Sequence, residues 1–214
     1  TSAAGEITNR PTLDPEPTVN QLSTKFSYTP ITVFASANTG ESNSVYFKVK
    51  LLDNSNKVIK SKTVIIRFNG VDYKVSTDSN GIAQLNVNLP SAGTYGFSVR
   101  FYGDDYYKDS SGNFNIVVKK NTVKITAKTK KVKKSKSKRT VKFVLKTSKN
   151  KVLKSKKVKL TINKKTYTVN TNKKGLATFK VKLPNKKKTY KYKLAFAGDK
   201  MNSAKSLSGK LKVY

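Results

Sequence analysis

The feature that most constrains this chain is an internal repeat. The segment KVIKSK at 57–62 recurs 94 residues later as KVLKSK at 151–156. Between 57–90 and 151–184, 15 of 34 positions are identical, and one inserted residue near Lys188 changes the offset to 95 in the remainder. A period this long indicates two whole domains rather than the short turns of a solenoid.

The repeat divides the chain into three segments. We expect a linker or N-terminal extension at 1–29, a first domain at 30–120 and a second domain at 121–214. The first segment holds three prolines and little periodicity, and its alternative interpretation is an added edge strand. The chain begins with Thr1 rather than Met, as expected of a mature or shortened fragment.

Each domain is predicted to consist of strands. Segments such as Val45–Leu51 and Phe97–Phe101 alternate apolar and polar residues, and no stretch has a sustained helical period. Asn69-Gly70, between two such runs, predicts a type I′ hairpin. About seven strands per repeat, with turns every 8–12 residues, favour an all-β fold of two antiparallel β-sandwiches. The predicted inward residues are Val49, Leu51, Ile66, Phe68, Leu85, Val87, Val99 and Phe101, then Phe143, Leu145, Leu160, Ile162, Phe179, Val181, Leu194 and Phe196.

The composition argues against catalysis. The chain has no cysteine and no histidine, which excludes Ser-His-Asp and Cys-His sites, thiolate zinc sites and disulfides. The few acids, Asp104 and Asp109 among them, are expected to cap turns rather than bind calcium. We therefore predict a non-enzyme without metal or cofactor. A Lys–Asn cross-link assisted by a buried acid is disfavoured in the second domain, whose one acid, Asp199, lies in a turn motif.

The charge is concentrated in the second domain. Of 45 basic and 11 acidic residues, 32 and one lie in 121–214, where all the basic residues but Arg139 are lysine. Such repulsion favours a polyanionic partner over a merely solvated surface. The predicted polyanion-binding residues form two clusters: Lys128, Lys130, Lys131, Lys133, Lys134, Lys136, Lys138 and Arg139 in the first, and Lys186, Lys187 and Lys188 in the second. The alternative is a general coat without a defined site.

Nucleic acid is the rival partner. Lysines neutralise phosphates well enough for non-specific binding, but sequence readout relies on arginine forks, fitting helices or exposed aromatic residues. The sequence contains no recognised nucleic-acid module, so sequence-specific nucleic-acid binding is not expected. No apolar run approaches the length of a membrane helix.

Two motifs carry a family resemblance. TDSNGIA at 77–83, followed by GTY at 93–95, resembles the turn and strand pattern of bacterial Ig-like domains in invasin- and intimin-type adhesins. FYGDDYY at 101–107 is similar to the ending of Ig-like repeats in adhesin-like proteins of methanogenic archaea. The second domain departs from both motifs, with Asn172 in place of Asp78 and Met201 in place of Tyr106.

The resemblance implies two tandem immunoglobulin-like domains of an extracellular adhesin or stalk at a cell surface or cell wall. The implied partners are an anionic cell-wall polymer or surface glycan for the lysine-rich domain, and a host or partner-cell ligand for the first domain. Non-specific nucleic-acid binding through the lysine-rich domain is the alternative function.

Overall fold

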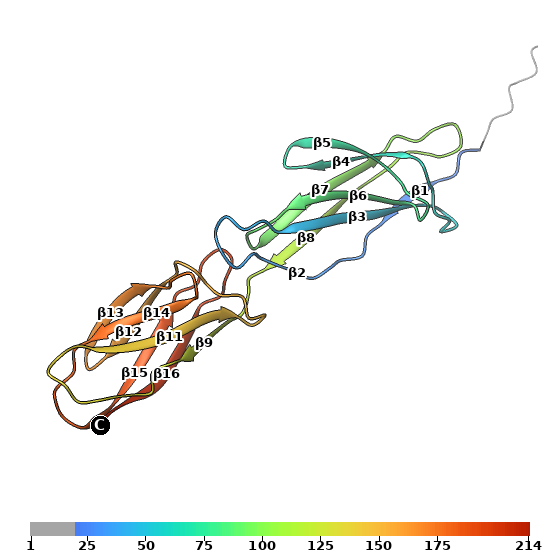
Figure 1. Ribbon diagram of the computed structural model, residues 1–214. Coiled ribbons are helices and arrows are strands. Elements are labelled where there is room, and N and C mark those ends of the chain that lie inside the picture. The colour runs from blue at the N-terminus through green and yellow to red at the C-terminus, as the bar shows by residue number, and fades with distance from the viewer. Residues whose placement is uncertain (1–19) are drawn as a thin grey trace, which may run out of the picture. The chain divides into compact units, whose positions relative to one another are not determined.

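The computed structural model describes residues 20–214, and strands connected by turns and loops make up this part of the chain. Each sheet takes all its strands from one side of Asn121, so the strands form two β-sandwiches of two sheets each (Figure 1). The prediction of an all-β fold with two tandem Ig-like sandwiches is confirmed. Within residues 20–214 there is no helix long and apolar enough to cross a membrane.

The first sandwich pairs a three-stranded sheet with a five-stranded sheet. The three-stranded sheet has the order β1-β3-β6 and consists of β1 (Thr24–Ser27), β3 (Ser44–Asp53) and β6 (Ile82–Asn88). The five-stranded sheet has the order β2-β8-β7-β4-β5 and consists of β2 (Val33–Phe34), β4 (Thr63–Phe68), β5 (Val71–Ser76), β7 (Gly93–Phe101) and β8 (Ser110–Lys119).

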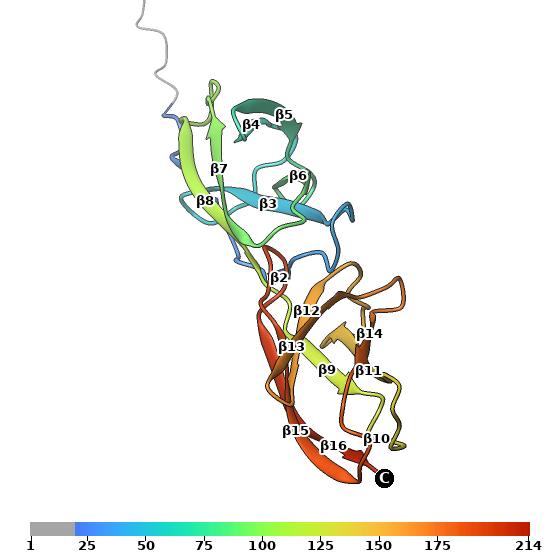
Figure 2. The same ribbon diagram turned by 90° about the vertical axis from the view of Figure 1, so that its left-hand side faces the viewer.

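The second sandwich repeats this arrangement. Its three-stranded sheet has the order β14-β11-β9, with β9 (Val123–Ala127), β11 (Arg139–Thr147) and β14 (Leu176–Val181). Its five-stranded sheet has the order β10-β16-β15-β12-β13 (Figure 2), with β10 (Lys131–Val132), β12 (Lys157–Ile162), β13 (Lys165–Asn170), β15 (Lys188–Phe196) and β16 (Lys205–Val213).

In both sandwiches the first segment of the chain contributes one short strand to each of the two sheets. β1 pairs antiparallel with β3, and the chain then crosses to the other sheet, where β2 pairs parallel with β8. β9 and β10 do the same with β11 and β16. Residues 24–27, expected in a linker or extension, thus form the added edge strand of the alternative interpretation. Residues 1–19 of that segment lie outside the described residues.

The division into domains at Lys120-Asn121 stays a prediction. Strand pairing follows it, but compactness alone groups the chain differently, with 49–83 and 98–112 in a unit of their own together with residues 20–28. Pairing gives the more direct definition of a sandwich, because backbone hydrogen bonds hold each sheet together.

The turns explain why the repeat keeps certain residues. Asn69 and Gly70 have φ of 50° and 76°, which confirms the type I′ hairpin between β4 and β5. In the TDSNGIA motif, the Asp78 Oδ1 accepts the backbone N–H groups of Asn80 and Ile82 at 2.8 and 3.0 Å. Asn172 makes the same two bonds in the second sandwich, because its amide oxygen accepts as a carboxylate oxygen does.

The inward residues follow the predicted alternation. Of the 16 predicted, 14 are buried, while Phe68 and Leu85 are half-buried. Phe68 is the last residue of β4 before the hairpin turn, and Leu85 lies on the edge strand β6. In the second core, Phe143 packs edge-on against Tyr192, with ring centroids 5.4 Å apart.

Candidate polyanion-binding surface

The two predicted lysine clusters lie at the same end of the second sandwich. The first surrounds β10, and the second lies on the loop that leads into β15. Val213 at the end of β16 pairs with Val132 on one side and with Lys188 on the other. The register of the sheet therefore brings together two clusters that are some fifty residues apart in the chain.

The lysines of both clusters are exposed. This holds for Lys128, Lys130, Lys131, Lys133, Lys134, Lys136, Lys138, Lys186, Lys187 and Lys188. Two of them lie over aromatic rings, with the Nζ of Lys131 5.3 Å from the Tyr214 ring centre and that of Lys188 5.1 Å from the Tyr190 ring centre. These contacts hold parts of the side chains on the surface while each ammonium group keeps its charge.

The predicted role of Arg139 is wrong. Arg139 is only 5% exposed, so its guanidinium is not available to a polyanion. Its guanidinium donates to the carbonyl oxygens of Lys133, at 3.3 Å, and of Leu183 and Pro184, the last at 3.1 Å. Arg139 is therefore a clamp that fastens the loop after β10 to the loop before β15.

The first sandwich contains the same clamp in a neutral form. The side-chain amide of Asn43 donates to the carbonyl oxygens of Phe34 and Leu89, both at 2.8 Å. Phe34 is the last residue of β2, and Leu89 corresponds to Leu183 in the repeat. In both sandwiches a buried or half-buried side chain thus donates hydrogen bonds to the carbonyls of these two loops. The donor is Asn43 in the first domain and Arg139 in the second.

The one acid of the second domain forms an ion pair and accepts two backbone hydrogen bonds. Asp199 Oδ2 lies 2.5 Å from the Nζ of Lys156, whose side chain is 9% exposed, and Asp199 Oδ1 accepts the N–H groups of Met201 and Asn202 at 2.8 Å. Lys62 and Asp104 form the equivalent pair in the first sandwich. Asp104 and Asp199 do cap turns, whereas Asp109 forms an ion pair with Arg100 at 3.8 Å. The remaining 31 cations of the second domain have no other side-chain carboxylate within it.

Burial by itself would raise the pKa of Asp199, but the hydrogen bonds from Lys156 and from the two backbone N–H groups lower it overall. Asn202 also donates its side-chain amide to Asp199, at 3.2 Å. Lys156 and Asn202 thus both contact Asp199, and the contact between Lys156 and Asp199 is an ion pair.

We expect the Lys156–Asp199 pair to set the acid stability of the second domain. Because the folded pKa of Asp199 is lowered, its contribution is complete above the unfolded value near 3.9 and is lost as pH falls through the folded pKa. Asp199→Asn should destabilise the domain by about 1–2 kcal/mol near pH 7, less than a fully buried pair would.

The measurement is the melting temperature of the second domain between pH 2 and 7. Asp199 is the only side-chain carboxylate in that domain, so the wild-type temperature should fall at acid pH more than that of Asp199→Asn. Lys157→Gln, which removes an exposed charge next to Lys156, is the control and should keep the wild-type profile. Parallel pH profiles for wild type and Asp199→Asn would contradict this assignment.

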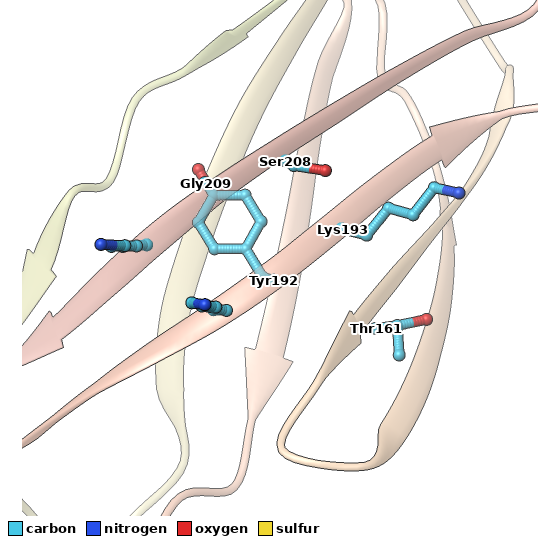
Figure 3. A pocket seen from close by; sticks show the side chains of 7 residues that line it. Thr161, Tyr192, Lys193, Ser208 and Gly209 are labelled. Carbon is cyan, nitrogen blue, oxygen red and sulfur yellow. The ribbon is translucent and has the colours of Figure 1, made fainter.

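A third group of lysines, absent from the predicted site, lies on the outer face of the five-stranded sheet. Lys191, Lys193 and Lys210 line a hollow there together with Thr161, Tyr192, Ser208 and Gly209 (Figure 3). The alternation of 190–194, YKYKL, predicts their outward direction. It does not predict that β16 lies beside β15, so the sequence could not place Lys210 next to Lys191.

Neither a protein-family model nor a curated protein matches the sequence. Among solved structures, titin domains A168–A170 match at a TM-score of 0.51 with 9% identity, over 90% of this chain and 66% of that one. Invasin, described as a bacterial integrin-binding protein, matches at 0.46 with 14% identity, over 90% of this chain and 39% of that one. The adhesin InvE of Yersinia pseudotuberculosis matches at 0.38 with 15% identity and 90% coverage.

The chain spans 58% of the length of the InvE structure and 39% of that of invasin. At such identities the likeness concerns the fold alone. None of the comparisons supports the resemblance to methanogen proteins. Together with the strand order, the match to titin establishes tandem immunoglobulin-like domains as the fold of this chain.

Proposed function

We propose that this chain is a non-catalytic part of a cell-surface adhesin or stalk, whose second domain contacts an anionic polymer of the cell wall or another polyanionic surface. It acts outside the cell, and the near-neutral first domain carries the contact with a partner cell. The observation that carries the proposal is the distribution of charge: exposed lysines cover the loops and the outer sheet face of a domain whose single acid is held by Lys156.

The architecture supports this function. Each Ig-like sandwich presents loops and a sheet face on a packed β-sheet frame, and loops held in this way are common binding surfaces. The bacterial adhesins named above share this general construction, which agrees with the proposal without carrying it. An anionic partner would also relieve the mutual repulsion of the lysines.

The test is binding of the full chain to an anionic wall polymer immobilised on beads, at 0.05 and 0.15 M salt. We expect binding at both salt concentrations, weaker at the higher one because exposed charges are screened. Replacing Lys186, Lys187 and Lys188 by glutamine should weaken it a few-fold without destabilising the domain, because all three are exposed and their loss relieves repulsion.

Oligonucleotides of several sequences, added as competitors, test for sequence preference. We expect them to displace the polymer without regard to sequence, because lysines neutralise phosphates without reading bases. A marked preference for one oligonucleotide sequence at 0.15 M salt would favour the nucleic-acid function instead. Failure to bind any polyanion at 0.15 M salt would contradict both.

A further inference from the structure

The outer face of β12, β15 and β16 has the features of a defined ligand site. We propose that it binds a linear acidic polysaccharide, whose carboxylate or sulfate groups pair with Lys191, Lys193 and Lys210 and whose hydroxyl groups bond to Thr161 and Ser208. The proposal rests on the polyanion-binding function above and names both the polymer class and a site apart from the two loop clusters.

The register of the sheet places these five side chains in two rows. Lys193 pairs with Thr161 on β12 and with Ser208 on β16, which makes one row across three strands. Lys191 and Lys210 pair with each other and begin the next row, two residues further along each strand. Directly paired side chains in a sheet lie about 5 Å apart and successive rows about 7 Å apart, so the three ammonium groups can approach one ligand together.

The small side chains between the lysines leave a hollow of about 500 Å³. The hollow is shallow and open to solvent, and this volume leaves room for a short stretch of sugar units lying along the sheet. In Figure 3 the polar ends of Lys193, Ser208 and Thr161 point to the same side. The aliphatic stems of the lysines give the hollow apolar walls, against which the ring faces of a sugar can pack.

The base of the hollow is fixed by the core. Tyr192 and Gly209 pair between the two rows, and the Tyr192 ring lies against Gly209, where an added Cβ would stand 2.5 Å from the Tyr192 Oη (Figure 3). Tyr192 is buried and packs on Phe143. The strands that carry the three lysines are therefore held by packing, so only the side chains of the site become ordered when the ligand binds.

The chemistry favours a polysaccharide over a nucleic acid. Single-stranded nucleic acids bind through aromatic side chains on which bases stack, and the outward positions around the hollow hold lysine, serine and threonine. Hydroxyl side chains that alternate with ammonium groups match a polymer that alternates anionic groups with sugar hydroxyls. The face also presents no groove-fitting helix or arginine fork for base readout.

The experiment measures binding of a heparin-derived octasaccharide to the full chain by isothermal titration at 0.15 M salt. Three forms are compared: wild type, a sheet variant with Lys191, Lys193 and Lys210 replaced by glutamine, and a loop variant with Lys186, Lys187 and Lys188 replaced by glutamine. Both variants lose three positive charges from exposed positions. We expect about tenfold or greater weakening in the sheet variant and less than about threefold in the loop variant.

A neutral variant separates the shape of the hollow from its charge. Ser208→Gln fills the hollow without changing the charge, and its exposed position makes the substitution safe for folding. It should weaken octasaccharide binding about threefold to tenfold, while binding of a polyphosphate of similar charge stays as in wild type.

The outcomes divide cleanly. Equal weakening in the sheet and loop variants, or no effect of Ser208→Gln, would overturn the sheet site and leave a general polyanion-binding coat. Melting temperatures that shift equally in the two variants, as expected from the loss of three repelling charges in each, show that the comparison reports binding rather than folding. If wild type binds neither octasaccharide nor polyphosphate at 0.15 M salt, the polyanion-binding function itself is wrong.

Discussion

Arg139→Ala is expected to destabilise the second domain by about 2–4 kcal/mol, because it leaves the carbonyl oxygens of Lys133 and Leu183 without their donor, each unsatisfied group costing about 1–3 kcal/mol where water does not replace it. It also removes one of the two donors to the Pro184 oxygen, which keeps the backbone N–H of Lys186. The guanidinium bonds to the carbonyls of Lys133, Leu183 and Pro184, and the residue is buried. A loss of this size should lower the melting temperature by about 10 °C or more in a domain of this length.

Calorimetry of the full chain provides the measurement, since only the transition that belongs to the second domain should move. Lys138→Ala is the matched control. Lys138 is exposed and precedes Arg139 in the chain, so its replacement removes the same charge and should shift the transition by no more than about 3 °C. The contrast between the two variants matters, because loss of any cation relieves repulsion in this domain. A shift in Arg139→Ala no larger than in Lys138→Ala would contradict the clamp.

The burial of Arg139 can be predicted from the sequence. Val141, Phe143 and Leu145 alternate along β11 and face inward, and Arg139 lies two residues before Val141, so the same alternation predicts that it faces inward too. The basic residues before Arg139 hide this alternation, because an arginine that follows a run of lysines is interpreted as part of the same charged loop. The strand began one residue earlier than the charge pattern suggested.

The outer sheet face was only half predictable. Alternation along β15 gives the outward direction of Lys191 and Lys193, but the neighbours of that strand depend on which strands join the sheet and in what register. Those pairings connect residues far apart in the chain, so periodicity cannot supply them. The same holds for Lys156, which only the folded chain brings to Asp199, 43 residues further along the sequence.

Added salt is expected to stabilise the second domain strongly and the first hardly at all. The second domain concentrates a net charge of +31 in 94 residues, against +3 in residues 1–120. Two unit charges 10 Å apart in water repel by about 0.4 kcal/mol, and a folded domain of this size holds many such pairs. Salt at 0.01 M leaves a screening length of about 30 Å, which spans the domain, whereas 0.15 M reduces it to about 8 Å.

Between these two salt concentrations the stabilisation should reach about 2 kcal/mol or more, a rise of about 8–16 °C in the melting temperature of the second domain. Sodium chloride is the appropriate salt, because sulfate strengthens hydrophobic burial in any protein. The transition of the first domain is the internal control, and the transition that Arg139→Ala lowers identifies the second. A polyanion that binds only the folded form should raise the same transition further at low salt. Equal shifts of the two transitions would mean that the lysines do not repel one another in the folded state, and the argument for an anionic partner would lose its main support.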